Sequence, residues 1–487
     1  MKRLITGIIM VFTITQLASA AEAADGWISL FDGHSLAGWK ASESQSTFQV
    51  RDGTITADGP RSHLFYTGSG GADFTNFEFS AEVRSRPGAN SGIYFHTAFQ
   101  PTNWPGSGFE VQINNTQPKH DNYYEFKKTG SLYGIRNLYK SIVRDDEWFT
   151  MAIRVSGHRV QVRLNDTLVV DYLEPAASPE DTGRPRRLSH GTFALQGHDP
   201  TSRVAFRNLR VRPLTGPVPA EDAQPAPVMD AYARQVLQLN QQNFPLVNFH
   251  AHLKGGLTLP GALEQSQASG VNFGIAMNCG LGFAITNDAG MAEFLQSVAG
   301  QPVFVGMQAE GREWVKMFSR EAVARFDYVF TDAMTFFDAN GKRTRLWLKD
   351  EVTVGDKQVF MDTLVARTVK LLSQEPIDIY VNPTFLPEEI AKEYDTLWTT
   401  ERMQQVITAA VSHDVAIEIN ARYRIPSAKF LKLAKQAGAK FSFGTNNTGN
   451  EVGGLDYCFE MFQECGLTAN DMFMPKPDGQ KAAQVKW

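Results

Sequence analysis

The pattern of apolar residues changes at a proline-rich stretch, and this change constrains the fold more than any other feature. Residues 27–214 contain short runs in which apolar and polar residues alternate, for example at 77–83 and 149–155, and no convincing amphipathic helix. Beyond Pro227, apolar strand-like runs alternate with helical segments. The first pattern is typical of antiparallel strands and the second of a parallel α/β barrel. We therefore predict a multidomain chain, an all-β sandwich or jelly roll followed by an α/β barrel.

The chain length agrees with two domains. At 487 residues the chain exceeds what one ordinary core fills. Residues 213–227 contain five prolines, which is typical of an extended, semi-rigid linker. The predicted units are a β-sandwich at 25–213, a linker at 214–229 and a barrel at 230–487.

The N-terminus has the parts of a signal peptide at residues 1–20. Lys2 and Arg3 precede an apolar run at 4–17, and Ala-Ser-Ala at 18–20 offers a cleavage site. The apolar run is shorter than the roughly 20 residues that span a membrane. We expect an exported protein, periplasmic or secreted, with no stable membrane insertion. The net charge of -5 and the lack of a long Lys/Arg run argue against a nucleic-acid partner.

Two neighbouring strand-like runs, 91–96 and 108–114, carry the most unusual surface. Strand side chains alternate between faces. One face is apolar, and the other carries hydrogen-bonding groups, namely Tyr94, His96, Glu110, Gln112 and Asn114. A solvated face would more usually carry Lys, Thr and Ser. The pattern indicates a surface that holds a hydrogen-bonding ligand such as a sugar.

Several ordered motifs in the first half support a family resemblance. They lie at 31–39, 48–53, 90–95, 108–112, 129–134, 195–198 and 206–210. In this order they resemble the 3-keto-disaccharide hydrolase family. The resemblance implies a concanavalin-like jelly roll that acts on 3-keto-glycosides.

The chemistry of such a substrate defines what the site needs. A ketone at C3 acidifies the proton at C2, so a base can remove it while the C1 substituent leaves by β-elimination, and water then adds to the enone. The reaction needs a base, a donor for the enolate oxygen and acid help to the leaving group, but not the paired carboxylates of ordinary glycosidases. Glu110 is the candidate base. The candidate proton donors are His96, His198 and Tyr133, and the candidate substrate-binding residues are Gln112, Gln196, Trp104 and Asn114.

Two points leave alternatives open in this half. Many members of the family have Arg where this chain has His96, which leaves the role of that residue open. The same polar face could also bind a glycan without cleaving it, as lectin-like jelly rolls do. His63 is interpreted as an ordinary surface or turn residue.

The second half carries a two-histidine motif at the end of its first expected strand. His250 and His252 are spaced i and i+2, so both imidazoles can meet one cation. With Glu310, the segment 327–332, and Glu418 in order, the region resembles the polymerase-and-histidinol-phosphatase (PHP) superfamily of metal-dependent barrels. The resemblance implies a distorted barrel that binds two or three metals for phosphoester hydrolysis. The ligands left in this chain are His250, His252 and Glu310, with Glu418 possible, and they could hold one divalent metal, zinc or manganese. The alternative is that the two histidines form a structural or sugar-contacting pair. The chain departs from the family pattern at Met334, Asn382, Asn446 and Thr448.

These observations leave three hypotheses. The first is an exported hydrolase of 3-keto-glycosides with a carbohydrate or glycoside substrate. The alternative is a glycan-binding sandwich attached to a metal-dependent PHP-type hydrolase. The third is a non-catalytic glycan-binding protein with two degenerate domains. The oligomeric state is left open.

Overall fold

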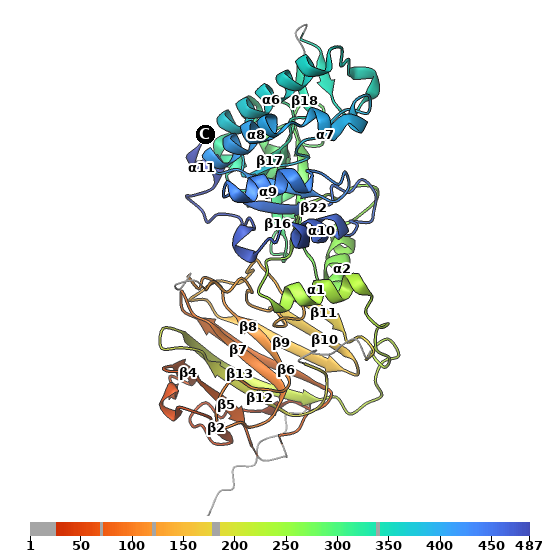
Figure 1. Cartoon of the computed structure of the whole chain (residues 1–487). Coiled ribbons are helices and arrows are strands. Elements are labelled where there is room, and N and C mark those ends of the chain that lie inside the picture. The colour runs from red at the N-terminus through yellow and green to blue at the C-terminus, as the bar shows by residue number, and fades with distance from the viewer. Residues whose placement is uncertain (1–25, 69–71, 119–122, 178–185, 338–340) are drawn as a thin grey trace, which may run out of the picture.

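The computed structural model describes residues 26–68, 72–118, 123–177, 186–337 and 341–487. The predicted signal peptide lies outside these residues. Figure 1 shows two lobes, a β-sandwich and an α/β barrel, with helices α1 and α2 beside the sandwich. No helix in the described ranges is long and apolar enough to cross a membrane.

The first lobe consists of two antiparallel sheets, which fit a jelly roll. The eight-stranded sheet runs in the order β11 (Thr167–Leu173), β10 (Arg159–Leu164), β9 (Phe149–Ser156), β6 (Phe77–Ser85), β13 (Arg203–Pro213), β4 (Thr54–Asp58) and β3 (Phe48–Arg51), with β1 (Ile28–Ser29) paired to β13. The five-stranded sheet runs β2 (Trp39–Ala41), β5 (Ser62–Tyr66), β12 (Thr192–Gly197), β7 (Ser91–Thr97) and β8 (Phe109–Ile113). The prediction of an antiparallel sandwich is confirmed.

The two sheets differ in how their outer faces are covered. Along β6 the buried residues Phe77, Phe79, Ala81 and Val83 alternate with more exposed ones, as expected for a strand with one face in water. Every residue of β7, β8 and β12 is buried. The polar face of the five-stranded sheet is therefore enclosed.

The second lobe is a closed barrel of seven parallel strands. They are β14 (Val247–Ala251), β15 (Asn272–Cys279), β16 (Phe304–Ala309), β17 (Tyr328–Thr331), β20 (Ile379–Tyr380), β21 (Ala416–Asn420) and β22 (Phe441–Gly444), and a separate hairpin pairs β18 (Thr335–Phe337) with β19 (Arg343–Arg345). The predicted strand–helix alternation and the α/β barrel are confirmed, whereas the assignment to the PHP superfamily stays a prediction.

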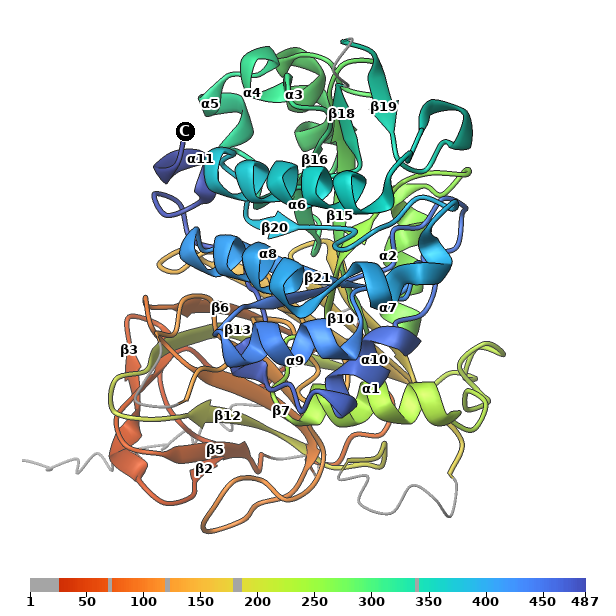
Figure 2. The ribbon, with the colours of Figure 1, turned by 45° about the horizontal axis from the view of Figure 1, so that its top comes forward.

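Helices pack around the barrel strands, as Figure 2 shows for α6, α8 and α9. The longer ones are α1 (Ala231–Gln241), α2 (Leu259–Ser269), α3 (Asp288–Ser297), α6 (Lys357–Gln374), α8 (Thr400–Ser412), α9 (Ala428–Gln436) and α10 (Asp456–Glu464). Short helices are α4 (Trp314–Met317), α5 (Arg320–Val323), α7 (Tyr394–Leu397) and α11 (Ala482–Val485), and single 3-10 turns occur at Gln45–Thr47, Lys349–Glu351, Ala391–Glu393 and Ala469–Asp471. On α8 the apolar residues recur with helical spacing, which explains why one face is buried.

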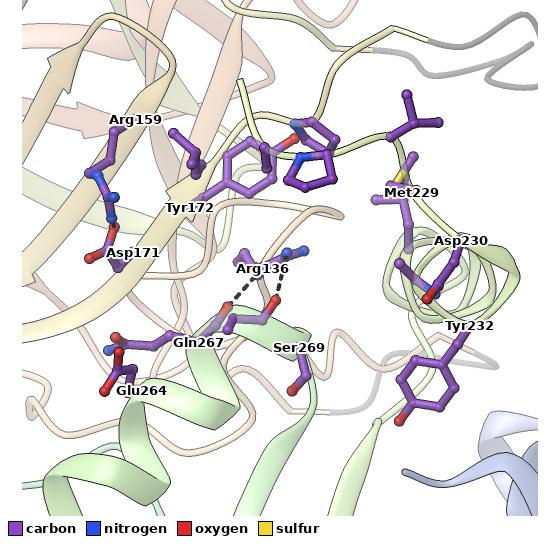
Figure 3. A pocket seen from close by; sticks show the side chains of 18 residues that line it. Arg136, Arg159, Asp171, Tyr172, Met229, Asp230, Tyr232, Glu264, Gln267 and Ser269 are labelled. Carbon is purple, nitrogen blue, oxygen red and sulfur yellow. Dashed lines mark hydrogen bonds and ion pairs between the residues drawn. The ribbon is translucent and has the colours of Figure 1, made fainter. Parts of the chain in front are cut away.

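Polar contacts join the two lobes. The Tyr139 hydroxyl donates to the Phe244 carbonyl at 2.7 Å, and Lys140 pairs with Asp327 at 2.7 Å. A cleft of about 500 Å³ lies between β10–β11, the linker, α1 and α2. In Figure 3 the Arg136 guanidinium lies in this cleft and donates to the carbonyl oxygens of Gln267 and Ala268. The lobes are thus held by specific hydrogen bonds as well as by the linker.

Candidate active site

A cavity of about 380 Å³ lies on the enclosed face of the five-stranded sheet. Six of the residues selected from the sequence line it, namely Trp104, Glu110, Gln112, Tyr133, Gln196 and His198. Regular pairing explains much of this convergence, because β7 lies between β8 and β12 and Tyr94 is opposite both Glu110 and Ala194. Side chains of one face on three adjacent strands therefore meet above β7.

Glu110 is the central group of the cavity. The Tyr94 hydroxyl donates to Glu110 Oε2 at 2.7 Å, and Gln196 Nε2 donates to Glu110 Oε1 at 3.0 Å. Burial raises the pKa of Glu110 to about 7, although the hydrogen bond from Tyr94 and the charge of Arg186 oppose this rise. A carboxyl group that titrates near neutrality and is held by two donors is suited to proton transfer.

Two glutamines offer unused acceptors beside it. Gln112 Nε2 donates to Asn90 Oδ1 at 2.9 Å, and Gln196 Nε2 donates to Glu110 and to Tyr94. The Oε1 atoms of Gln112 and Gln196 are buried and have no hydrogen-bond partner in the described structure. Buried acceptors are normally satisfied, so these two oxygens are suited to ligand hydroxyl groups.

A second carboxylate, Glu125, lies on the other side of the cavity. Its Oε2 accepts from the hydroxyls of Tyr123 at 2.5 Å and Tyr133 at 2.9 Å. Its Oε1 lies 3.2 Å from Lys127 Nζ, and both side chains of this ion pair are buried. Burial and the charge of Glu125 raise the pKa of Tyr133, so its hydroxyl keeps its proton.

His198 and Trp104 lie together at the cavity, with ring centres 5.2 Å apart. His198 Nδ1 is 2.7 Å from Asp199 Oδ2. Burial raises the pKa of Asp199, but hydrogen bonds from Thr201, His198 and Ser202 outweigh it and lower that pKa to about 2. Asp199 is therefore an anion that orients the imidazole through Nδ1. Nε2 is the ring nitrogen that does not contact Asp199.

The predictions that placed His96 and Asn114 on the cavity face are wrong. His96 has a positive φ of 53°, at an irregularity in the pairing of β7 with β12, so strand alternation fails there. Its ring lies between the Thr75 carbonyl and the Ser189 amide instead. Asn114 follows the end of β8, and its side chain donates to the carbonyls of Glu125 and Lys127.

The sequence analysis missed four polar residues that line the cavity and misinterpreted a fifth residue nearby. Those missed are Asn90, Tyr123, Glu125 and Arg186. Arg186 is anchored by a 2.7 Å hydrogen bond from Nη1 to the Gly108 carbonyl. His63 is fully buried on β5, packs edge-on against Tyr94 and Trp104, and is no surface residue. It lies on β5 opposite Gln196, and this long-range pairing is not visible in the sequence.

The predicted metal ligands in the barrel do not form a metal cluster. Among the described residues, no three or more His, Cys, Asp or Glu side chains are grouped to hold one ion. Glu418 accepts at 2.6 Å from His250 Nδ1, and the amides of Asn382 and Asn420 donate to its other oxygen. Glu310 is buried beside Asp332, and burial and that neighbour raise its pKa to about 8. The four predicted ligands are therefore not grouped in the described residues, and one divalent metal in this lobe stays a prediction.

Comparison with known proteins identifies the first lobe. The family model described as a 3-keto-alpha-glucoside-1,2-lyase-like domain matches residues 26–212. Residues 26–212 are therefore a 3-keto-disaccharide hydrolase-like domain, as the resemblance implied.

One curated relative also matches part of the chain. The 3-keto-disaccharide hydrolase of Bacteroides thetaiotaomicron is 34% identical over 172 residues, which cover 31% of this chain and 59% of the relative. The chain thus matches less than two thirds of that protein's length.

Solved structures also resemble part of the chain. A solved structure of a protein from Parabacteroides distasonis has 22% identity and a TM-score of 0.34. The match covers 40% of this chain and 97% of that chain. A carbohydrate-binding module of family 66 from Bacillus subtilis has 14% identity and a TM-score of 0.26. The match covers 36% of this chain and 96% of that module.

Proposed function

We propose that the sandwich cavity cleaves 3-keto-glycosides by elimination and hydration. The observation that carries this proposal is the buried Glu110 carboxyl, held by two hydrogen-bond donors, with a pKa of about 7. The family description names a 1,2-lyase of 3-keto-alpha-glucosides, which agrees with an elimination across C1 and C2. The name of the curated relative agrees with it as well.

Glu110 is the base in this proposal. It takes the C2 proton, and the electron pair of the C–H bond forms the enolate of the C3 ketone. When the ketone re-forms, the C1–O bond breaks and leaves a C1=C2 double bond. Water then adds its oxygen to C1 and gives a proton to His198, which replaces the one lost to the leaving oxygen, and Glu110 returns its proton to C2. A base with a pKa near the working pH is the most effective for such a transfer.

The other cavity residues supply charge and hydrogen bonds. Arg186 carries a cation into the cavity and is the donor for the enolate oxygen. His198, oriented by Asp199, gives a proton to the leaving oxygen. Gln112 and Gln196 accept from sugar hydroxyls through their free oxygens, and Tyr133, held by Glu125, orients the sugar.

The test is turnover of a 3-keto-glucoside by the full chain and by two variants. Glu110→Gln is expected to lower kcat by about a thousandfold or more, since it removes the base. Glu82→Gln is the matched control, because Glu82 pairs with Arg207 on the other sheet and is expected to leave kcat unchanged. Turnover that survives Glu110→Gln would overturn the assignment of the base, and binding without turnover by the wild type would favour a glycan-binding module.

Export is a separate proposal that rests on residues 1–20 alone. If they form a signal peptide, expression of the full chain in a bacterial host gives a mature protein in the periplasm or medium that starts near Ala21. A protein that keeps Met1 and stays in the cytoplasm would refute it.

A further inference from the structure

One residue of the α/β lobe contacts the sandwich directly behind the cavity. Asn243 lies between α1 and β14. Its Oδ1 accepts from the Phe126 backbone amide and from Lys127 Nζ, each at 3.1 Å, and its Nδ2 donates to the Tyr124 carbonyl at 2.7 Å. A single side-chain amide therefore holds the backbone on both sides of Glu125.

The segment that Asn243 holds brings Glu125 into the cavity. Lys127 Nζ reaches Glu125 Oε1 and Asn243 Oδ1, and the Lys127 side chain is 0% exposed. A buried ion pair must recover a large desolvation cost through good geometry and further hydrogen bonds. The Lys127 backbone amide also donates to Glu125 Oε1 at 2.9 Å, and Asn243 supplies the further bond to Lys127 Nζ from the other lobe.

Asn243 is itself fixed in place. Its φ of 54° lies in the left-handed region, which asparagine tolerates better than most residues. On either side of it, the Asn240 carbonyl accepts from Asn137 Nδ2 at 2.9 Å and the Phe244 carbonyl accepts from the Tyr139 hydroxyl. The loop is thus pinned to the sandwich before and after Asn243.

We propose that Asn243 is a positioning residue of the sandwich cavity, acting through Lys127 and Glu125 on the hydroxyls of Tyr123 and Tyr133. Its kinetic part rests on the proposed function. The α/β lobe then supports chemistry in the sandwich. Without the Asn243 side-chain amide, Lys127 Nζ loses one hydrogen-bond acceptor, and the Glu125 carboxylate can turn away from the Tyr133 hydroxyl.

Asn243→Gly in the full chain tests the proposal, because glycine keeps the left-handed backbone and removes only the amide. We expect kcat for a 3-keto-glucoside to fall about tenfold, which corresponds to a small displacement of a substrate-orienting group. In a Glu125→Gln background the same change is expected to add less than about twofold, because coupled residues are not additive. Hydrogen exchange across 123–128 is expected to accelerate.

Asn165→Gly is the matched control. Asn165 also has a left-handed backbone and accepts from the Thr150 amide, but it lies in the turn between β10 and β11. We expect it to leave kcat unchanged. If Asn243→Gly does not fold, Lys127→Met removes the same contact together with the ion pair to Glu125, and it is expected to lower kcat at least as much.

The outcomes separate the two proposals. If the wild type has no turnover, the proposed function fails, and the positioning role is decided by exchange alone: unchanged exchange across 123–128 refutes it. If the wild type is active, equal losses of kcat in the wild-type and Glu125→Gln backgrounds show a merely structural role and overturn the inference. An unchanged kcat in the folded Asn243→Gly variant also overturns the inference. If that variant does not fold, an unchanged kcat in Lys127→Met has the same meaning.

Discussion

The carboxyl group of Glu110 lies directly over Gly92, which belongs to the neighbouring strand. A Cβ atom built at Gly92 would come within 2.5 Å of Glu110 Oε1. Gly92 is paired with Gln112, two positions along from the pair formed by Tyr94 and Glu110. The missing side chain therefore makes room for the carboxyl group to cross β7 and reach Gln196 on β12.

This relationship predicts that Gly92→Ala displaces the proposed base. The new methyl group and Glu110 Oε1 cannot share the space, so the carboxyl group turns away from Gln196. We expect kcat on a 3-keto-glucoside to fall by about a hundredfold, the scale of a 1 Å misplacement. Gly216→Ala is the control, because a Cβ there meets nothing within 4 Å. Equal kcat for Gly92→Ala and the wild type would show that the position of Glu110 is not critical.

The pH dependence of activity follows from the raised pKa of Glu110. The base must be ionised, so kcat/KM is expected to rise with pH through about 7, where burial places the Glu110 pKa. The measurement is kcat/KM from pH 5 to pH 9 with a non-ionising 3-keto-glucoside. An acid limb centred near 4.5, the ordinary value for glutamate, would show that the group controlling the rate is not a buried Glu110.

The free energy of unfolding is expected to fall over the pH range in which kcat/KM rises. Between pH 4.5 and about 7 the folded chain keeps a proton on Glu110 that the unfolded chain has released. The contribution of Glu110 to the free energy of unfolding is therefore fully present below pH 4.5 and is lost as pH rises to about 7. The loss should reach about 3 kcal/mol in wild type relative to Glu110→Gln, which lacks this titration. Urea unfolding of both chains at pH 4.5, 6 and 7.5 measures it, and a constant difference would contradict a raised pKa.

Strand alternation could be read from the sequence wherever the strands are regular. It placed Glu110 and Gln112 on the cavity face because β8 is continuous, and it failed at His96 because a residue with positive φ breaks the alternation. Glu125 and Arg186 lie outside any strand, so no periodicity could locate them. Their position depends on long-range contacts.

The barrel shows the same limit. Strand–helix alternation is local and predicted the parallel barrel, whereas a metal cluster depends on where side chains from distant strands point. The bond between His250 Nδ1 and Glu418 joins two strands that are far apart in the sequence, and no spacing in the sequence reveals it.

The last prediction concerns how Trp104 binds substrate. Its side chain is 41% exposed and still packs against His198 and His63, so one part of the indole remains available at the cavity. Aromatic rings stack on the C–H face of a sugar and contribute on the order of 1 kcal/mol. Trp104→Ala is therefore expected to raise KM for a 3-keto-glucoside about fivefold and to change kcat less than about twofold. Trp148→Ala is the control, because Trp148 packs under Arg84 and Arg207 away from the cavity. A fall in kcat with unchanged KM would instead assign Trp104 to the positioning of His198.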